Sequence, residues 1–267
     1  MTPDPTPSAA RDLTGPASDQ APGSAPKASA HTGAARVLVI DDEAEIGRAV
    51  RAGLASAGFT VLWTATAEEG MAQVAQWHPD VVILDLSLPD MDGLDVCREL
   101  RAWTQAPIIV LSVRAEERDK VTALELGADD YLTKPFTIGE LIARVRVAIR
   151  HAVGVAGAGS RFQTGGLVLD FERRRVTVDG VEVHLTPTEY EVLKYLALNF
   201  ERVITHRTLL RAVWGPEYED EAHYLRVFVG QLRRKIEPEP SRPIYLLTVP
   251  GIGYRLANPV GEGDGNG

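Results

Sequence analysis

Five side chains that could carry phosphoryl chemistry follow strand-like stretches of the chain: Asp41, Asp42, Asp85, Ser112 and Lys134. Carboxylates that crowd together cannot all remain ionised cheaply unless a hard divalent cation neutralises them, and Mg²⁺ suits a site built from oxygen ligands. A carboxylate beside Mg²⁺ can attack a phosphoryl group, while a lysine and a hydroxyl offset charge on the transferred oxygens. Each residue taken singly could be a helix cap or a turn, but the set predicts that Asp85 becomes an aspartyl phosphate.

Apolar runs alternate with segments of helical periodicity in the first half of the chain. Residues 37–40, 81–84 and 108–111 are continuous aliphatic runs, as in strands covered on both faces, and side chains such as Ile46 and Val50 recur at helix spacing. The strand-helix unit occurs five times, which predicts an α/β, doubly wound, five-stranded parallel sheet of the flavodoxin-like kind. Ligands of such sheets bind at the carboxyl ends of the strands, so that edge would gather the five side chains.

A different architecture is expected after the small, Gly-rich segment 152–160, which is typical of a flexible linker. Asp179-Gly180 indicates a hairpin turn, and Thr186 caps a helix with Pro187 at its first position and Glu189 three residues after the cap. The expected elements are strands 167–170, 175–178 and 181–185, helices from 187, near 207–213 and over 222–236, and a hairpin over 245–256. Three helices with a β-hairpin wing make an α+β winged helix-turn-helix.

Positive charge gathers on the expected helix 222–236, which contains no acidic residue. Its apolar residues fall on one face, and the other arc predicts DNA contacts from His223, Arg226, Val227, Gly230, Arg233 and Arg234. Arginine can bond the major-groove edge of guanine, so Arg226 is the first choice for base readout. Arg255, in the hairpin, is expected to contact the minor groove or a phosphate. A plain solvated face is the alternative for such a helix.

The composition bounds the class of protein. A length of 267 residues accommodates about two domains, and the net charge of −9 resides almost wholly in the first half. The single Cys97 excludes a disulfide framework and a cysteine-based zinc site, and is expected to be a buried helix thiol. No apolar run approaches the ~18 residues that a bilayer requires, so a cytoplasmic protein without a membrane partner is expected.

The expected boundaries are a disordered tail at 1–35, a phosphoacceptor domain at 36–151, a linker at 152–160, a DNA-binding domain at 161–258 and a disordered tail at 259–267. The first segment is rich in Pro and small residues and lacks the apolar core of a signal peptide.

Four motifs make the chain similar to OmpR/PhoB response regulators, and the resemblance covers nearly everything after residue 35. They are Val39-Ile-Asp-Asp-Glu43, the stretch Leu84 to Gly93, Leu111-Ser-Val-Arg114, and the stretch Gly127 to Phe136. The resemblance implies that Asp85 takes phosphate from a sensor histidine kinase. It also implies that Asp42, Asp85 and the Ser87 backbone carbonyl ligate Mg²⁺, that Asp41 binds through water, and that Lys134-Pro135 is a cis peptide.

The same resemblance implies how the signal leaves the site. Ser112 and Tyr131 match the pair whose hydroxyl turns toward the phosphate while the aromatic ring turns inward. Residues that match intermolecular ion pairs of activated dimers are Lys120, Asp130, Glu140 and Arg144. We expect Lys120 to pair with Glu140, and Asp130 with Arg144, across a homodimer formed on phosphorylation. Double-stranded DNA and RNA polymerase are the other expected partners.

Within the family, five stretches resemble regulators of high-affinity potassium-transport (Kdp) operons: 84–93, 117–141, 213–216, 223–226 and 230–235. The long N-terminal tail departs from the pattern, and Arg226 and Gly230 differ from residues of several other family members. The operator sequence of those members therefore does not predict the operator of this protein.

Two other functions share part of this pattern. A haloacid-dehalogenase-like phosphatase also uses an aspartate nucleophile, Mg²⁺ and a lysine, but needs a carboxylate two residues after the nucleophile, where this chain has Ser87. A winged-helix regulator that acts without phosphate would not need the intact set of Asp42, Asp85, Ser112 and Lys134. The sequence favours a phosphorylation-activated, DNA-binding regulator that is not an enzyme.

Overall fold

The expected parallel sheet is present in the computed structural model, which describes residues 34–153 and 161–259. Its strands are β1 (Arg36–Ile40), β2 (Thr60–Thr64), β3 (Val81–Asp85), β4 (Ile108–Ser112) and β5 (Asp130–Thr133). They lie in the order β2-β1-β3-β4-β5 and every neighbouring pair is parallel. The predicted doubly wound fold is confirmed.

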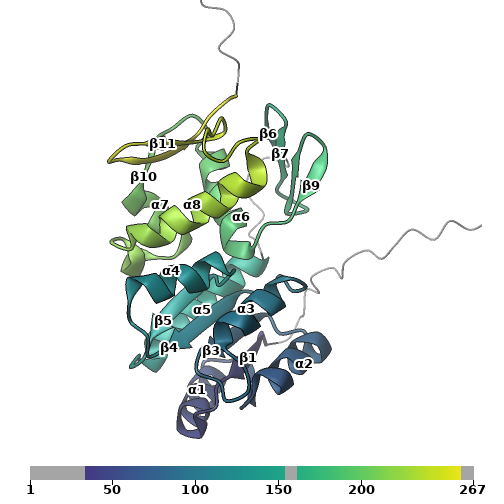
Figure 1. The fold of residues 1–267 in the computed structure, drawn as a ribbon, viewed down its shortest axis with the longest axis vertical. Coiled ribbons are helices and arrows are strands. Elements are labelled where there is room, and N and C mark those ends of the chain that lie inside the picture. The colour runs from purple at the N-terminus through teal and green to yellow at the C-terminus, as the bar shows by residue number, and fades with distance from the viewer. Residues whose placement is uncertain (1–33, 154–160, 260–267) are drawn as a thin grey trace, which may run out of the picture. The chain divides into compact units, whose positions relative to one another are not determined.

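Five helices cover the two faces of this sheet (Figure 1): α1 (Ala44–Ser56), α2 (Ala67–Trp77), α3 (Gly93–Arg101), α4 (Glu117–Glu125) and α5 (Ile138–Val153). One core packs Val50 of α1 and Leu141 of α5 beneath the sheet, and another packs Val74 of α2 and Leu100 of α3 above it. The buried thiol of Cys97 lies in α3, as predicted. Strands covered on both faces explain the uninterrupted aliphatic runs.

The second half contains two antiparallel sheets. The first, in the order β6-β7-β8-β9, comprises β6 (Arg161–Thr164), β7 (Leu167–Asp170), β8 (Arg175–Val178) and β9 (Val181–Val183). The second, in the order β10-β12-β11, comprises β10 (Ile204–Thr205), β11 (Leu246–Val249) and β12 (Gly253–Leu256). Asp179 and Gly180 both have positive φ, as the predicted hairpin turn requires.

The helices of this half are α6 (Pro187–Leu198), α7 (His206–Val213), the 3₁₀ turn η1 (Pro216–Tyr218) and α8 (Ala222–Ile236). The capping box of Thr186 and Glu189 is present at the start of α6. Two strands were missed. β6 has Thr164 as its only buried residue, and β10 has two residues, so neither produces a readable alternation.

Parts of the predicted boundaries fall outside the described residues: most of the linker, at 154–160, and most of both tails, at 1–33 and 260–267. α5 continues to Val153, into the segment expected to be linker. Among the residues described, no helix has the length and apolarity to cross a membrane.

Gly93, the first residue of α3, packs directly behind the end of β3. A Cβ at this position would lie 2.5 Å from both the carbonyl oxygen of Asp85 and the Cα of Leu86. Both neighbours are backbone atoms, so they cannot move aside without distorting the strand that carries Asp85.

We therefore predict that Gly93→Ala lowers the free energy of unfolding by about 1 to 3 kcal/mol, the usual cost of overpacking. Gly139→Ala on α5 is the matched control, because a Cβ there meets no atom within 4 Å. It should change the free energy of unfolding by less than about 0.5 kcal/mol. Urea denaturation measures both, and equal effects would contradict the close approach.

Candidate functional site

The predicted chemical residues meet at the carboxyl edge of the parallel sheet. Asp41 follows β1, Asp85 ends β3, Ser112 ends β4 and Lys134 follows β5. The Lys134 Nζ donates to Asp85 Oδ2 at 2.6 Å, to Glu43 Oε1 at 2.8 Å and to Asp41 Oδ2 at 3.0 Å. One ammonium group thus joins two carboxylates of the segment after β1 to the carboxylate at the end of β3.

Burial sharpens the electrostatics of this cluster. Asp41 is fully buried and the Asp85 side chain is 2% exposed, so bulk water hydrates neither carboxylate. Burial raises the pKa of Asp41, against the lowering effect of Lys134. Burial alone would lower the pKa of Lys134, but hydrogen bonds to Asp85, Glu43 and Asp41 raise it above its ordinary value. The lysine is therefore a permanent cation of the site.

The donor set also fits a divalent cation. Asp41, Asp42 and Asp85 each offer a carboxylate oxygen, and these atoms lie within 4.8 Å of one another. Asp42 is exposed while the other two are buried, so the cluster opens toward solvent on one side. Ser87, on the exposed loop after β3, donates its amide to Asp85 Oδ1 at 3.1 Å, which brings its backbone beside the cluster. Oxygen ligands of this kind suit Mg²⁺.

Two positioning residues were missed by the sequence analysis. Trp63 Nε1, on β2, donates to the Asp41 carbonyl at 2.9 Å and so orients the acidic loop. Glu43 supplies the third carboxylate of Lys134, and its amide donates to Asp41 Oδ1 at 2.8 Å. The unbroken run Asp41-Asp42-Glu43 was a signal for Glu43, whereas no sequence pattern links Trp63 to a residue on the neighbouring strand.

The expected switch residues both contact Arg114, in the loop after β4. The buried Ser112 Oγ accepts from the Arg114 amide at 3.0 Å, and Tyr131 OH donates to the Arg114 carbonyl at 2.7 Å. Tyr131 is 2% exposed and lies on β5. The Lys134-Pro135 peptide is cis, as the resemblance implied.

Three of the four residues expected to form a dimer face, Asp130, Glu140 and Arg144, are paired within the chain. Arg144 on α5 donates to both carboxylate oxygens of Asp130 at 3.0 Å and to Glu140 Oε1 at 2.7 Å. Burial raises the pKa of Asp130 to about 6, against the lowering effect of Arg144. Lys120 lies half-buried on α4. The expected pairs between two copies, Lys120 with Glu140 and Asp130 with Arg144, stay predictions.

On α8, the expected DNA contacts divide into two groups. Arg226 and Arg234 are exposed, and a Cβ on Gly230 would meet no atom within 4 Å, so this side of the helix is open. Val227, expected on the same arc, is buried. His223 Nδ1 lies 3.1 Å from Glu221 Oε2.

The hairpin of β11 and β12, which is the wing, is bonded to α8 through Arg233. Arg233 donates to the Leu246 carbonyl at 2.7 Å and to Thr248 Oγ1 at 2.8 Å, which anchors β11. Arg255 on β12 is partly exposed and lies 3.5 Å from Glu201 Oε2. Arg233 therefore makes short hydrogen bonds within the domain, whereas Arg255 has a longer ion pair at the surface.

A parallel sheet with this acidic edge, followed by a winged helix, defines a receiver joined to a DNA-binding output domain. Residues 37–146 match the response regulator receiver domain, and residues 180–256 match the C-terminal domain of transcriptional regulatory proteins. The chain belongs to the response regulators of the OmpR/PhoB type. It is a two-component transcriptional regulator, and its two domains imply a sensor kinase and DNA as partners.

The chain is 49% identical over 221 residues to the transcriptional regulatory protein KdpE of Mycobacterium tuberculosis. The aligned residues are 82% of this chain and 98% of that protein. It is 45% identical over 220 residues to the KDP operon transcriptional regulatory protein KdpE of Escherichia coli, with the same coverage of 82% and 98%. A solved structure of a RitR mutant superposes with a TM-score of 0.69 at 23% identity, over 84% of this chain and 99% of that one, which shows the fold alone.

Lys134→Ala should lower the free energy of unfolding by about 3 to 5 kcal/mol at neutral pH, because it leaves buried carboxylates without their cation. The loss should shrink as pH falls, since protonated carboxylates no longer need a counter-charge. Urea denaturation without divalent ions, at neutral and acid pH, measures the difference. Arg48→Ala, an exposed cation on α1, is the control. A loss independent of pH would refute the electrostatic role.

Proposed function

We propose that Asp85 is the phosphoacceptor of this regulator and that phosphorylation activates specific DNA binding by α8. The observation that supports this assignment is the contact of one lysine with Asp85, Asp41 and Glu43 at the carboxyl edge of the sheet. In the transfer, an Asp85 carboxylate oxygen forms a bond to the phosphorus of a kinase phosphohistidine. The phosphorus–nitrogen bond breaks, and the histidine nitrogen leaves with its electron pair.

Each neighbour has a defined part in this step. Lys134 sits 2.6 Å from Asp85 Oδ2 and would offset the negative charge that the phosphoryl group brings. Asp41, Asp42, Asp85 and the Ser87 carbonyl would hold Mg²⁺, which supplies charge neutralisation at the phosphoryl oxygens. Ser112, released from Arg114, would donate its hydroxyl to the phosphoryl group, and Tyr131 would move with it. The chain accepts phosphate and is not itself an enzyme.

The output is proposed to be control of a high-affinity potassium-transport (Kdp) operon in the cytoplasm. The support is 49% and 45% identity to two KdpE proteins over 98% of their lengths. Base readout is assigned first to Arg226. The other contacts to the bases would come from the same helix, from His223, Val227, Gly230 and Arg234. Contacts to the DNA backbone are assigned to Arg233 and Arg255. Activation would bring two copies together through Lys120, Asp130, Glu140 and Arg144, and would present the regulator to RNA polymerase. Val227, Asp130 and Arg144 must first become accessible for these roles, and Arg233 must leave Leu246 and Thr248.

The phosphoacceptor is tested with a small-molecule phosphodonor. Wild type should gain one phosphoryl group by intact mass in the presence of Mg²⁺ and much less with a chelator. Asp85→Asn should gain none, because an amide is not a nucleophile of this kind. Asp95→Asn, at a carboxylate of α3 whose side chain is 48% exposed, is the matched control and should behave as wild type. Phosphorylation retained by Asp85→Asn would end the assignment.

The DNA contacts are tested by titration of a duplex from a Kdp promoter and a scrambled duplex at several salt concentrations. Arg226→Ala should cost about 1 to 3 kcal/mol on the promoter duplex and relax preference at one base. Arg255→Ala should weaken both duplexes alike and flatten the slope of log affinity against log salt by about 0.9, the value for one neutralised phosphate. Equal losses on both duplexes for Arg226→Ala would make α8 an electrostatic anchor instead of the reader.

A further inference from the structure

Gly230 lies in the middle of α8, at a position where the fold itself does not require a glycine. Glycine is, after proline, the least favourable residue of a helix interior, because it loses the most backbone freedom on folding. A helix therefore retains a glycine where a side chain would collide or where φ must be positive. Gly230 has the negative φ of a helical residue, and a Cβ built on it would meet no atom of another element within 4 Å.

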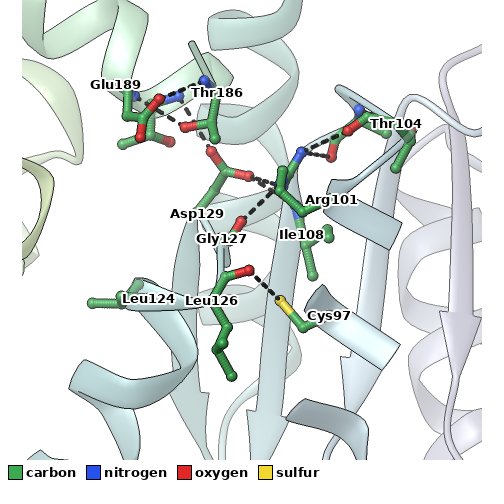
Figure 2. A network of polar contacts seen from close by, with 12 residues as sticks. Cys97, Arg101, Thr104, Ile108, Leu124, Leu126, Gly127, Asp129, Thr186 and Glu189 are labelled. Carbon is green, nitrogen blue, oxygen red and sulfur yellow. Dashed lines mark hydrogen bonds and ion pairs between the residues drawn. The ribbon is translucent and has the colours of Figure 1, made fainter. Parts of the chain in front are cut away.

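Glycines elsewhere in the chain have reasons within the fold. Gly127, in the turn between α4 and β5, has a φ of +107°, and its carbonyl accepts from Arg101 Nε at 2.9 Å (Figure 2). A Cβ on each glycine inside α1 and α2 would lie 2.3 or 2.4 Å from a side chain of another element: Gly47 from Trp63, Gly53 from Ile138, and Gly70 from Ile40. None of these reasons applies to Gly230, so the reason for this glycine lies in what α8 binds.

Two exposed arginines lie on either side of Gly230 along α8. Arg226 and Arg234 are four residues before and after it, which places all three on one side of the helix. Leu225 and Leu232 pack into the core from the other side. At 1.5 Å per residue the two arginine Cα atoms are about 12 Å apart along the axis, or roughly three to four base steps, so the two side chains can reach different base pairs. We call the gap at Gly230 between the two arginines the notch.

The notch selects its partner by polarity and by size. Gly230 has no side chain that could donate or accept a hydrogen bond, and the peptide groups around it are bonded within the helix, so a group that enters must be apolar. The group must also be small, because the notch is the space of one missing side chain. In the major groove every base pair presents nitrogen or oxygen atoms, and the single apolar group is the C5-methyl of thymine. A thymine methyl therefore fits the notch.

We propose that Gly230 receives the C5-methyl group of one thymine of the operator, and that this contact brings α8 close enough for Arg226 to reach its base. The inference rests on the proposed function of α8 as the DNA-reading helix, and it adds one base that the operator must contain. A methyl group at position 230 and the methyl group of the base would compete for the same space. The glycine thus lowers the stability of the helix and makes the thymine accessible to it.

The variant Gly230→Ala separates stability from recognition. The added Cβ meets no other element and improves the helix propensity, so the variant should unfold at a temperature equal to that of wild type or up to about 4 °C higher. The same Cβ should weaken the binding of phosphorylated protein to a Kdp promoter duplex by roughly 5- to 150-fold, the effect of one mismatched base pair. The slope of log affinity against log salt should not change, because no charge is altered.

Uracil, which lacks the methyl group of thymine, identifies the base. Kdp promoter duplexes are synthesised with uracil in place of one thymine at a time. At one position, uracil should weaken the binding of wild type by about fourfold, the effect of one buried methyl group. At the same position, uracil should strengthen the binding of Gly230→Ala, because the space of the lost methyl group accepts the Cβ. The two proteins should therefore prefer opposite bases at one position and agree at all others.

Gly139→Ala is the matched control. Among the helical glycines that the structure describes, Gly139 is the other one at which a Cβ meets no atom within 4 Å, and it lies on α5, outside the DNA-binding half. This variant undergoes the same chemical change and should follow wild type on every duplex. Full-length proteins are used throughout, with phosphodonor and Mg²⁺. A scrambled duplex measures binding that does not depend on sequence, and all three proteins should bind it alike.

Three results would overturn the proposal. An unfolding temperature of Gly230→Ala below that of wild type would give the glycine a structural role. Wild-type affinity of Gly230→Ala for the promoter duplex would mean that no group of the DNA enters the notch. A loss that uracil reverses at no position would mean that α8 approaches a sugar or a phosphate there. Failure of wild type to prefer the promoter duplex over the scrambled one would contradict the proposed function of α8, whereas a preference that Gly230→Ala keeps in full would contradict this inference alone.

Discussion

The charge of Lys134 is the constraint on which the receiver depends. Two buried carboxylates, Asp41 and Asp85, share this ammonium, and its side chain is itself 7% exposed. Buried charges are tolerated only when they are paired, so the lysine and the carboxylates stabilise one another. Removal of either partner leaves an unpaired buried charge, which destabilises the fold. A cation or a phosphoryl group that enters the cluster must change this balance. The same interaction therefore makes the site stable at rest and sensitive to a new charge.

Strand β5 lies between the pocket and the contact with the second half of the chain. It contains only Asp130–Thr133, yet Lys134 at its end lies in the pocket while Asp130 and Tyr131 meet η1 and α8. A strand of this length is fully extended and hydrogen-bonded to β4 along its whole length. One short, hydrogen-bonded strand thus lies between the lysine of the pocket and the two residues that contact the second half of the chain.

The sequence predicted what depends on local pattern and on the rules of parallel sheets. Asp41, Asp85, Ser112 and Lys134 could be brought together because strand ends meet at one edge, and Thr186 with Glu189 could be recognised as a cap from their spacing. Trp63 and Val227 could not be placed. Trp63 bonds the carbonyl of Asp41, which is 22 residues away along the chain, and the helical period of α8 assigns Val227 to the open arc although the structure buries it.

The contact between receiver and α8 has the chemistry of a reversible interface. Tyr224 and Gln231 donate to backbone carbonyls, and the ion pair between Asp130 and Arg144 stays within the receiver. Carbonyl and hydroxyl groups regain hydrogen bonds from water when the surfaces separate, so each of these bonds adds only about 0.5 to 1.5 kcal/mol to closure. An interface held by buried ion pairs across the domains would resist opening far more strongly. The hydrogen bonds from Tyr224 and Gln231 therefore add less to this contact than the apolar side chains buried beside them.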